Sequence, residues 1–203
     1  MIEQVEYARA FWFGASDGSK ILAKNQNTAT WKEWWEIKCG RLESNFGNVY
    51  TEAGTLFEHP ILKTIDSDMR LDLELRIPSL CLRVHYDGDI AGTINECKTF
   101  KATKTFEVSK PYWQQAQIEM YVFQEFYENF KGLNIRAYPM TSEDYKVRFE
   151  DEVVIDESKV LTFPVKYDKY FIKAEVIPQL KTLAKRLKKD VGKDCGVWEI
   201  AEF

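Results

Sequence analysis

The chain has 203 residues, of which 45% are hydrophobic and 14% aromatic, and its formal net charge is −4. This apolar content excludes a disordered chain, and the acidic balance excludes a protein that binds nucleic acid through overall positive charge. No window approaches the roughly 18 apolar residues of a membrane span, and the first residues lack the pattern of a secretory signal. We therefore expect a soluble, cytoplasmic protein.

The first part of the chain predicts three helices. Residues 16–24 form a short helix with Ser16 as its N-cap, and a capping-box pattern at Thr30 opens a second helix that Gly40 ends. Residues 48–64 predict a third helix. Because proline lacks the N–H that a helix interior needs, we expect a break or kink at Pro60.

Strands and a long helix follow. Three strands are predicted at residues 71–77, 80–87 and 92–100, the first with strict apolar–polar alternation. Ser109 and Pro111 then open a helix that runs to residue 130. Two further strands are predicted at residues 134–140 and 160–167, with a hairpin arm between them at 145–155. A basic amphipathic helix is predicted after them, up to residue 190. This order predicts one domain over residues 1–203, of the α/β or α+β class, with a mixed central sheet flanked by helices.

The four cysteines predict no metal cluster. They are Cys39, Cys81, Cys97 and Cys195. None belongs to a C-x-x-C pair, so their spacing argues against zinc and iron–sulfur sites. We expect reduced, mostly buried thiols.

The stretch from Tyr86 to Phe100 (YDGDIAGTINECKTF) carries a group of charged residues. Glycines 88 and 92 predict the turn, so Asp87 ends one strand opposite Glu96 on the next. Glu96 and Lys98 share one face of their strand, whereas Cys97 points to the other face and the core. Two such carboxylates can share a Mg²⁺ ion. On spacing alone, a solvated hairpin with charged cross-strand pairs is the simpler interpretation.

Asp87, Glu96, Cys97 and Lys98 together resemble the D…E-x-K signature of the PD-(D/E)xK nuclease superfamily. Further stretches resemble its lambda exonuclease-like (YqaJ) phage recombination branch. Residues 9–24 (RAFWFGASDGSKILAK) are similar to the opening in which an arginine and a serine contact the DNA 5′-phosphate. Arg9 and Ser16 match those positions, and a helix N-terminus favours phosphate.

Two helical stretches extend the resemblance. EAGTLFEHPIL, at residues 52–62, is similar to the helix whose glutamate completes the metal site, and Glu58 matches that glutamate. PYWQQAQIEMYV, at residues 111–122, resembles the Y-x-x-Q-x-Q segment, with Gln115 beside the catalytic centre. Gln117 instead resembles the glutamine of a RecB-like Q-x-x-x-Y pattern. The two glutamines point about 200° apart on a helix, so at most one faces the site.

The resemblance runs in order from Arg9 to Met140, and the last third of the chain does not align. It departs from the family at Tyr86, where a proline is usual, and at Asp89, a second candidate ligand close to the turn. Asp87 is preferred because the family carries Asp-Gly there. The resemblance thus implies a catalytic core at about residues 9–140, with C-terminal strands and a helix over 141–203.

The resemblance implies a restriction-endonuclease-like core and a Mg²⁺- or Mn²⁺-dependent deoxyribonuclease. It would degrade linear duplex from its ends, in the 5′-to-3′ direction, during phage-type recombination in the host cytoplasm. The implied metal ligands are Glu58, Asp87, Glu96 and the Cys97 carbonyl. Lys98 and Gln115 would position water and substrate, and Lys101 and Lys104 would contact the DNA backbone. The implied partners are a single-strand annealing protein and two further copies in a homotrimer.

Two alternatives remain open at this stage. One is a RecB- or Cas4-like DNA nuclease, whose Cas4-like members usually carry an iron–sulfur cluster that the scattered cysteines here disfavour. The other is a non-catalytic DNA- or protein-binding phage module on the same fold. The acidic balance favours such a protein-binding module, whereas the intact D…E-x-K set favours catalysis.

Overall fold

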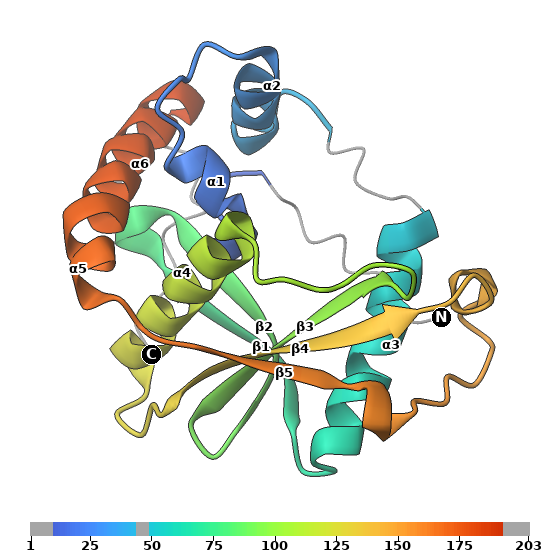
Figure 1. Ribbon diagram of the computed structural model, residues 1–203. Coiled ribbons are helices and arrows are strands. Elements are labelled where there is room, and N and C mark those ends of the chain that lie inside the picture. The colour runs from blue at the N-terminus through green and yellow to red at the C-terminus, as the bar shows by residue number, and fades with distance from the viewer. Residues whose placement is uncertain (1–9, 44–48, 193–203) are drawn as a thin grey trace.

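The computed structural model describes residues 10–43 and 49–192 of the chain (Figure 1). A mixed five-stranded sheet lies at its centre, with the strands side by side in chain order. The strands are β1 (Arg70–Ile77), β2 (Leu82–Ile90), β3 (Thr93–Lys101), β4 (Gly132–Met140) and β5 (Leu161–Val165). β3 and β4 are parallel, and the other neighbours are antiparallel. The predicted α/β class with a mixed sheet is confirmed.

Helices cover both faces of this sheet. They are α1 (Gly18–Ile21), α2 (Ala29–Lys38), α3 (Val49–Ile65), α4 (Lys110–Phe126), α5 (Lys169–Phe171) and α6 (Ile177–Val191). α3 lies on one side, and α4 and α6 lie on the other together with α1 and α2 (Figure 1). α4 also joins the parallel strands β3 and β4, which need such a crossover. No helix in the two described ranges has the length and apolarity to span a bilayer.

Side chains of β3 alternate between these two helical layers. Cys97 is buried on the α3 side, where it packs with Phe57 and Ile61. Glu96 and Lys98 point to the α4 side, where the Lys98 ammonium lies 5.3 Å from the centre of the Tyr112 ring. The predicted division of the E-C-K triplet between the two faces is therefore confirmed.

The helix starts differ from the predictions. Ser16 is not an N-cap but lies inside a short 3₁₀ turn, η1 (Ala15–Asp17), which leads into α1. The Asp17 carboxylate instead accepts a hydrogen bond of 2.7 Å from the Gly14 N–H. α2 begins at Ala29, two residues earlier than a helix with Thr30 as its N-cap would begin. The N-cap is Thr28, whose hydroxyl accepts the Trp31 N–H at 3.3 Å.

Three further predictions were wrong in detail. The helix does not break at Pro60: α3 continues through it, with Phe57, Ile61 and Leu62 on either side fully buried, so packing maintains the helix. α4 ends at Phe126 rather than residue 130. The expected hairpin arm at 145–155 contains no strand in the described chain. A short turn starts there, and the Asp144 carboxylate accepts the Thr141 N–H at 2.6 Å, so a side-chain bond replaces ladder pairing.

The β2–β3 turn is Ala91–Gly92, and Gly88 lies within β2 rather than in the turn. Both turn residues have positive φ, 48° and 86°, as a two-residue hairpin turn requires. A Cβ on Gly92 would lie 2.0 Å from the Asn129 carbonyl oxygen, so glycine is also needed for this close approach. The strand therefore continues past Asp87 and through Asp89.

Candidate active site

The candidate site lies where β2 and β3 separate. In the described chain these strands pair at three positions next to the turn, the last being Gly88 with Asn95. Asp87 and Glu96 are the first residues beyond that pair. The Asp87 carboxylate accepts the Cys97 N–H at 2.7 Å, in place of a ladder bond. Because the N–H and C=O of one strand residue point to the same edge, the Cys97 carbonyl is directed to this gap as well.

Glu96 is held by two side chains of the site. Its side chain is 3% exposed, and its Oε1 atom accepts hydrogen bonds from the Lys98 ammonium at 2.6 Å and the Gln115 amide at 2.5 Å. Its Oε2 atom is buried and has no hydrogen-bond partner. Lys98 comes from the same strand and Gln115 from α4, so the sheet and the helix together hold this carboxylate.

Carboxylates from both faces interact at the gap. Burial raises the pKa of Glu58, a half-buried residue of α3, and the Glu96 charge raises it further. Burial raises the pKa of Asp87 well above its usual value, with added contributions from Glu96 and Glu58. The structure thus brings together the three predicted carboxylate ligands at a place where their negative charges are unfavourable without a cation.

Lys98 is held as a cation. Burial acts to lower its pKa, but the carboxylates of Glu96 and Asp87 outweigh burial and raise the pKa above the ordinary lysine value. A lysine in this state donates hydrogen bonds and positive charge rather than accepting a proton. Of the roles open to Lys98 from the sequence, orienting water and stabilising developing charge therefore fit the geometry.

The structure separates the two glutamines of α4. The Gln115 amide faces the site and bonds Glu96. Gln117 is fully buried on another face, where its amide donates to the Lys166 carbonyl at 2.8 Å and accepts the Asp168 N–H at 2.7 Å. Gln117 therefore connects α4 to the chain after β5 and has a structural role.

Asp89 is also occupied elsewhere. Its carboxylate forms a two-armed ion pair with the Arg70 guanidinium, with N–O distances of 2.7 and 3.0 Å. Arg70 also donates to the Tyr127 hydroxyl at 3.1 Å. Asp89 thus joins β2 to β1 and to the end of α4, while Asp87 faces Glu96.

Sequence reasoning missed Glu119. This residue is fully buried on α4, one turn after Gln115, and its Oε1 atom accepts a second hydrogen bond from the Gln115 amide at 2.8 Å. Burial raises the pKa of Glu119 well above its usual value, and the Glu96 charge adds to the effect. The four-residue spacing from Gln115 places both side chains on one helix face, which is the signal that could have identified it.

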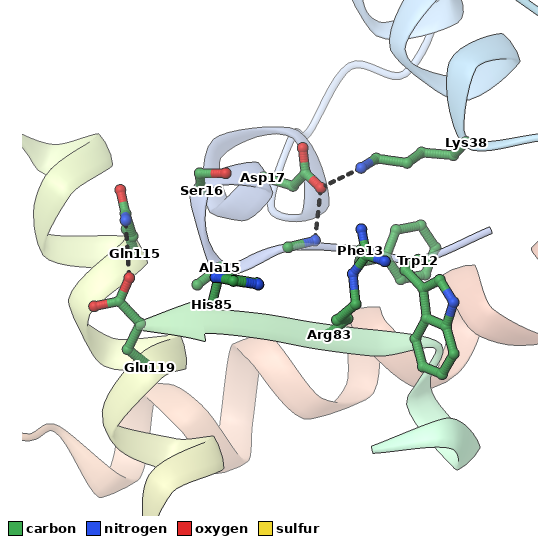
Figure 2. A pocket seen from close by; sticks show the side chains of 11 residues that line it. Trp12, Phe13, Ala15, Ser16, Asp17, Lys38, Arg83, His85, Gln115 and Glu119 are labelled. Carbon is green, nitrogen blue, oxygen red and sulfur yellow. Dashed lines mark hydrogen bonds and ion pairs between the residues drawn. The ribbon is translucent and has the colours of Figure 1, made fainter. Parts of the chain in front are cut away.

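A pocket of about 250 Å³ adjoins this cluster (Figure 2). Gln115 and Glu119 form one wall, and the η1 segment with Ser16 forms another. The remaining polar lining comes from Asp17, Lys38, Arg83 and His85. Lys38 is paired with Asp17 at 2.7 Å, and His85 contacts Glu74 at 3.2 Å. Arg9, which was predicted to act beside Ser16, lies outside the described residues.

The remaining predicted residues lie further along β3 or in separate cores. Lys101 ends β3, and Lys104 lies in the exposed turn that follows it. Cys39 and Cys81 belong to the core on the α4 side, whereas Cys97 belongs to the smaller cluster under α3. Cys195 lies outside the described residues. The described thiols are thus not gathered into one site.

The carboxylates suit a divalent cation in chemistry, although their side chains are not arranged as a formed centre. Among residues 10–43 and 49–192, no three His, Cys, Asp or Glu side chains form a group that could hold a metal ion as placed. Glu96 nevertheless has a buried, unpartnered oxygen, and its negative charge contributes to the raised pKa values of Glu58 and Asp87. Oxygen ligands of this kind are those that Mg²⁺ and Mn²⁺ prefer. The residues present therefore fit such an ion.

Comparison with known proteins identifies the fold. No protein-family model and no curated protein matches the sequence. The structure is similar to the alkaline exonuclease LHK-Exo from Laribacter hongkongensis, with a TM-score of 0.64, 14% identity and 91% of each chain covered. Its complex with dAMP gives a TM-score of 0.63 and 15% identity, again over 91% of each chain. A phage-related exonuclease from Haemophilus somnus 129PT gives 0.60 and 14%, covering 89% of this chain and 93% of that one. The chain therefore has the fold of these exonucleases.

Proposed function

We propose that this protein is a metal-dependent DNA exonuclease that acts on the ends of linear duplex. The observation that carries the proposal is the Glu96 carboxylate, which Lys98 and Gln115 hold at the gap opposite Asp87. A carboxylate pair with an adjacent lysine is the set of groups that metal-assisted phosphodiester hydrolysis requires. The shared fold with two exonucleases supports the same reaction class.

Each residue of the gap has a role in this proposal. Glu58, Asp87, Glu96 and the Cys97 carbonyl would hold Mg²⁺ or Mn²⁺. The bound ion would supply an activated water and neutralise charge on the phosphate. Lys98 donates positive charge to the oxygens of the reacting phosphate, and the Gln115 amide keeps the Glu96 carboxylate in place.

The adjoining pocket suits the terminal phosphate of the substrate. Ser16 supplies a hydroxyl, and Arg83 and His85 supply nitrogen donors on strand β2, which also carries Asp87. Such groups bind phosphate through charge-assisted hydrogen bonds. We assign 5′-phosphate recognition to this pocket together with Arg9, and backbone contacts to Lys101 and Lys104. Recognition of the 5′ end would give 5′-to-3′ degradation.

The biological setting belongs to the same proposal. Removal of the 5′-terminated strand leaves a 3′ overhang, which is the substrate of a single-strand annealing protein in phage-type recombination. A homotrimer that encloses the duplex would keep the enzyme on its substrate. The annealing partner, the homotrimer and a site of action in the host cytoplasm are all proposed from the sequence resemblance.

End-labelled DNA tests the activity directly. The full-length protein with Mg²⁺ or Mn²⁺ is incubated with linear duplex, covalently closed circular duplex and single strands. We expect linear duplex to be degraded, closed circles to resist, and the 5′ label to be released before the 3′ label. Absence of digestion with either metal would overturn the proposal, and efficient nicking of closed circles would indicate an endonuclease.

Variants of the site connect the activity to these residues. Lys98→Ala and Glu96→Ala are expected to lower the rate by about 100-fold or more while the circular dichroism spectrum stays native. Lys181→Ala, on the exposed face of α6, is the matched control and should keep wild-type activity. Equal activity of all three variants would exclude the gap as the catalytic centre.

A further inference from the structure

Two buried carboxylate oxygens in the described part of the chain have no partner, and both belong to one place. Among all buried side-chain nitrogen and oxygen atoms of the described residues, only the Oε2 atoms of Glu96 and Glu119 form no hydrogen bond. Their side chains are almost completely buried, at 3% and 0% exposed. Because an unsatisfied buried polar group is costly, two of them side by side indicate a missing ligand.

The other half of each carboxylate is already engaged. The Gln115 amide nitrogen donates to Glu96 Oε1 at 2.5 Å and to Glu119 Oε1 at 2.8 Å, so one NH₂ group orients both side chains. The backbone at Glu119 is held as well, since its carbonyl accepts the Tyr86 hydroxyl at 2.9 Å. These bonds fix the two carboxylates and leave both Oε2 atoms available.

The electrostatics of this pair require a positive partner. Glu96 and Glu119 share one Gln115 amide group, and both side chains are almost completely buried, so their negative charges lie close together away from water. Lys98 is the nearest ammonium, and it is bonded to Glu96 Oε1 rather than to an Oε2 atom. Two buried carboxylates in contact are stable only with a cation or a shared proton between them.

We propose that Glu119 is a further ligand of the divalent cation that Glu96 holds, with the two Oε2 atoms binding it from the α4 side. This inference rests on the proposed function, because it takes Glu96 as a metal ligand. Hard divalent cations take several carboxylate oxygens, and Glu119 adds one to the set from Glu58 and Asp87. Gln115 and Glu119, which contact each other, also line the pocket of Figure 2.

Mn²⁺ binding to the full-length protein tests the proposal without any measurement of cleavage. Free Mn²⁺ is followed by electron paramagnetic resonance, and binding heat by calorimetry. Glu119→Gln keeps the size and hydrogen-bonding shape of a protonated glutamate but removes the ligand charge. We expect it to weaken Mn²⁺ binding by about tenfold or more. Glu125→Gln, six residues later on the exposed face of the same helix, should bind as the wild type does.

The alternative occupant, a proton, gives a different result. If Glu119 is only a protonated donor to Glu96, glutamine replaces it without loss and Mn²⁺ affinity stays within twofold of wild type, which overturns the inference. In a further outcome, Glu119→Gln binds Mn²⁺ normally while Asp87→Asn loses both Mn²⁺ binding and DNA digestion. That result would refute the role of Glu119 and leave the nuclease proposal standing. A wild-type protein that binds no Mn²⁺ would overturn the inference, and the DNA digestion decides the proposed function separately.

Discussion

Two aspartates only two positions apart on β2 have different partners. Asp87 accepts the Cys97 N–H at the point where β2 and β3 separate, and its pKa is raised by burial and by neighbouring carboxylates. Asp89 is neutralised by Arg70 on β1. An aspartate without a cationic partner is available to a metal ion, whereas an aspartate paired with arginine is not. Asp87 is therefore the candidate ligand.

This difference predicts opposite outcomes for two isosteric substitutions. Asp87→Asn should remove digestion of linear duplex while the protein stays folded, because it removes the charge of a proposed metal ligand that forms no ion pair with an arginine. Asp89→Asn should leave the activity of the folded protein within a few-fold but lower its free energy of unfolding by about 1–3 kcal/mol, because the Arg70 bonds are weakened. Urea unfolding and rates per folded molecule separate the two. Loss of activity in Asp89→Asn without loss of stability would contradict this assignment.

At the scale of the element, α4 serves two purposes on two faces. Gln115 and Glu119, four residues apart, face the gap between β2 and β3. Gln117, on another face, binds the backbone at Lys166 and Asp168, where the chain leaves β5 and enters α5. α4 thus supports the site and also attaches the C-terminal part of the protein to the core.

Alanine at each glutamine should show this division. Gln117→Ala removes the bonds to the Lys166 C=O and the Asp168 N–H and leaves a cavity at a fully buried position, so we expect the free energy of unfolding to fall by about 2–4 kcal/mol. Its activity at low temperature, per folded molecule, should be retained. Gln115→Ala should instead lower the rate by at least about tenfold with a smaller effect on stability. Chemical denaturation and initial rates of digestion test both, and a catalytic defect in Gln117→Ala alone would contradict the division.

The whole molecule places Glu58, Asp87, Glu96 and Glu119 close to one ammonium, that of Lys98. The pKa values of Glu58, Asp87 and Glu119 are raised in the folded state, so the folded protein binds more protons than the unfolded chain. The contribution of these groups to stability is present below their unfolded pKa values, near 4, and is lost as the pH rises through the folded values. The raised pKa of Lys98 changes the free energy of unfolding only above about pH 10, so it does not contribute where the carboxylates titrate.

Stability of the metal-free protein should therefore decrease as the pH is raised from about 5 to 8. For each group, one unit of difference between the folded and unfolded pKa corresponds to about 1.4 kcal/mol over the whole titration, from below the unfolded pKa to above the folded pKa. Mg²⁺ should restore stability more strongly at pH 8 than at pH 5, because it binds the ionised carboxylates. Urea midpoints with chelator and with Mg²⁺ at the two pH values measure this. Glu119→Gln should have a flatter pH profile, and equal Mg²⁺ effects at both pH values would contradict the account.

The sequence alone predicted the five strands and the main helices, and it named the candidate residues of the site. Apolar–polar alternation predicted the first strand, because side-chain direction in a strand has a period of two, and the same period placed Cys97 on the face opposite Glu96 and Lys98. The mixed sheet followed from the order of the elements. The D…E-x-K pattern, with Glu58 and Gln115, named residues that the structure brings together at the gap.

The tertiary structure decided what local pattern could not. The turn lies at Ala91–Gly92, where the backbone of Gly92 closely approaches Asn129, which is 37 residues away in the sequence. Asp89, Gln117 and Glu119 received their roles from partners on other elements, and such contacts leave no local periodicity. The sequence from Tyr86 to Phe100 shows which carboxylates are candidate metal ligands. Which of them are paired with a cation depends on where Arg70 and Lys98 lie in space.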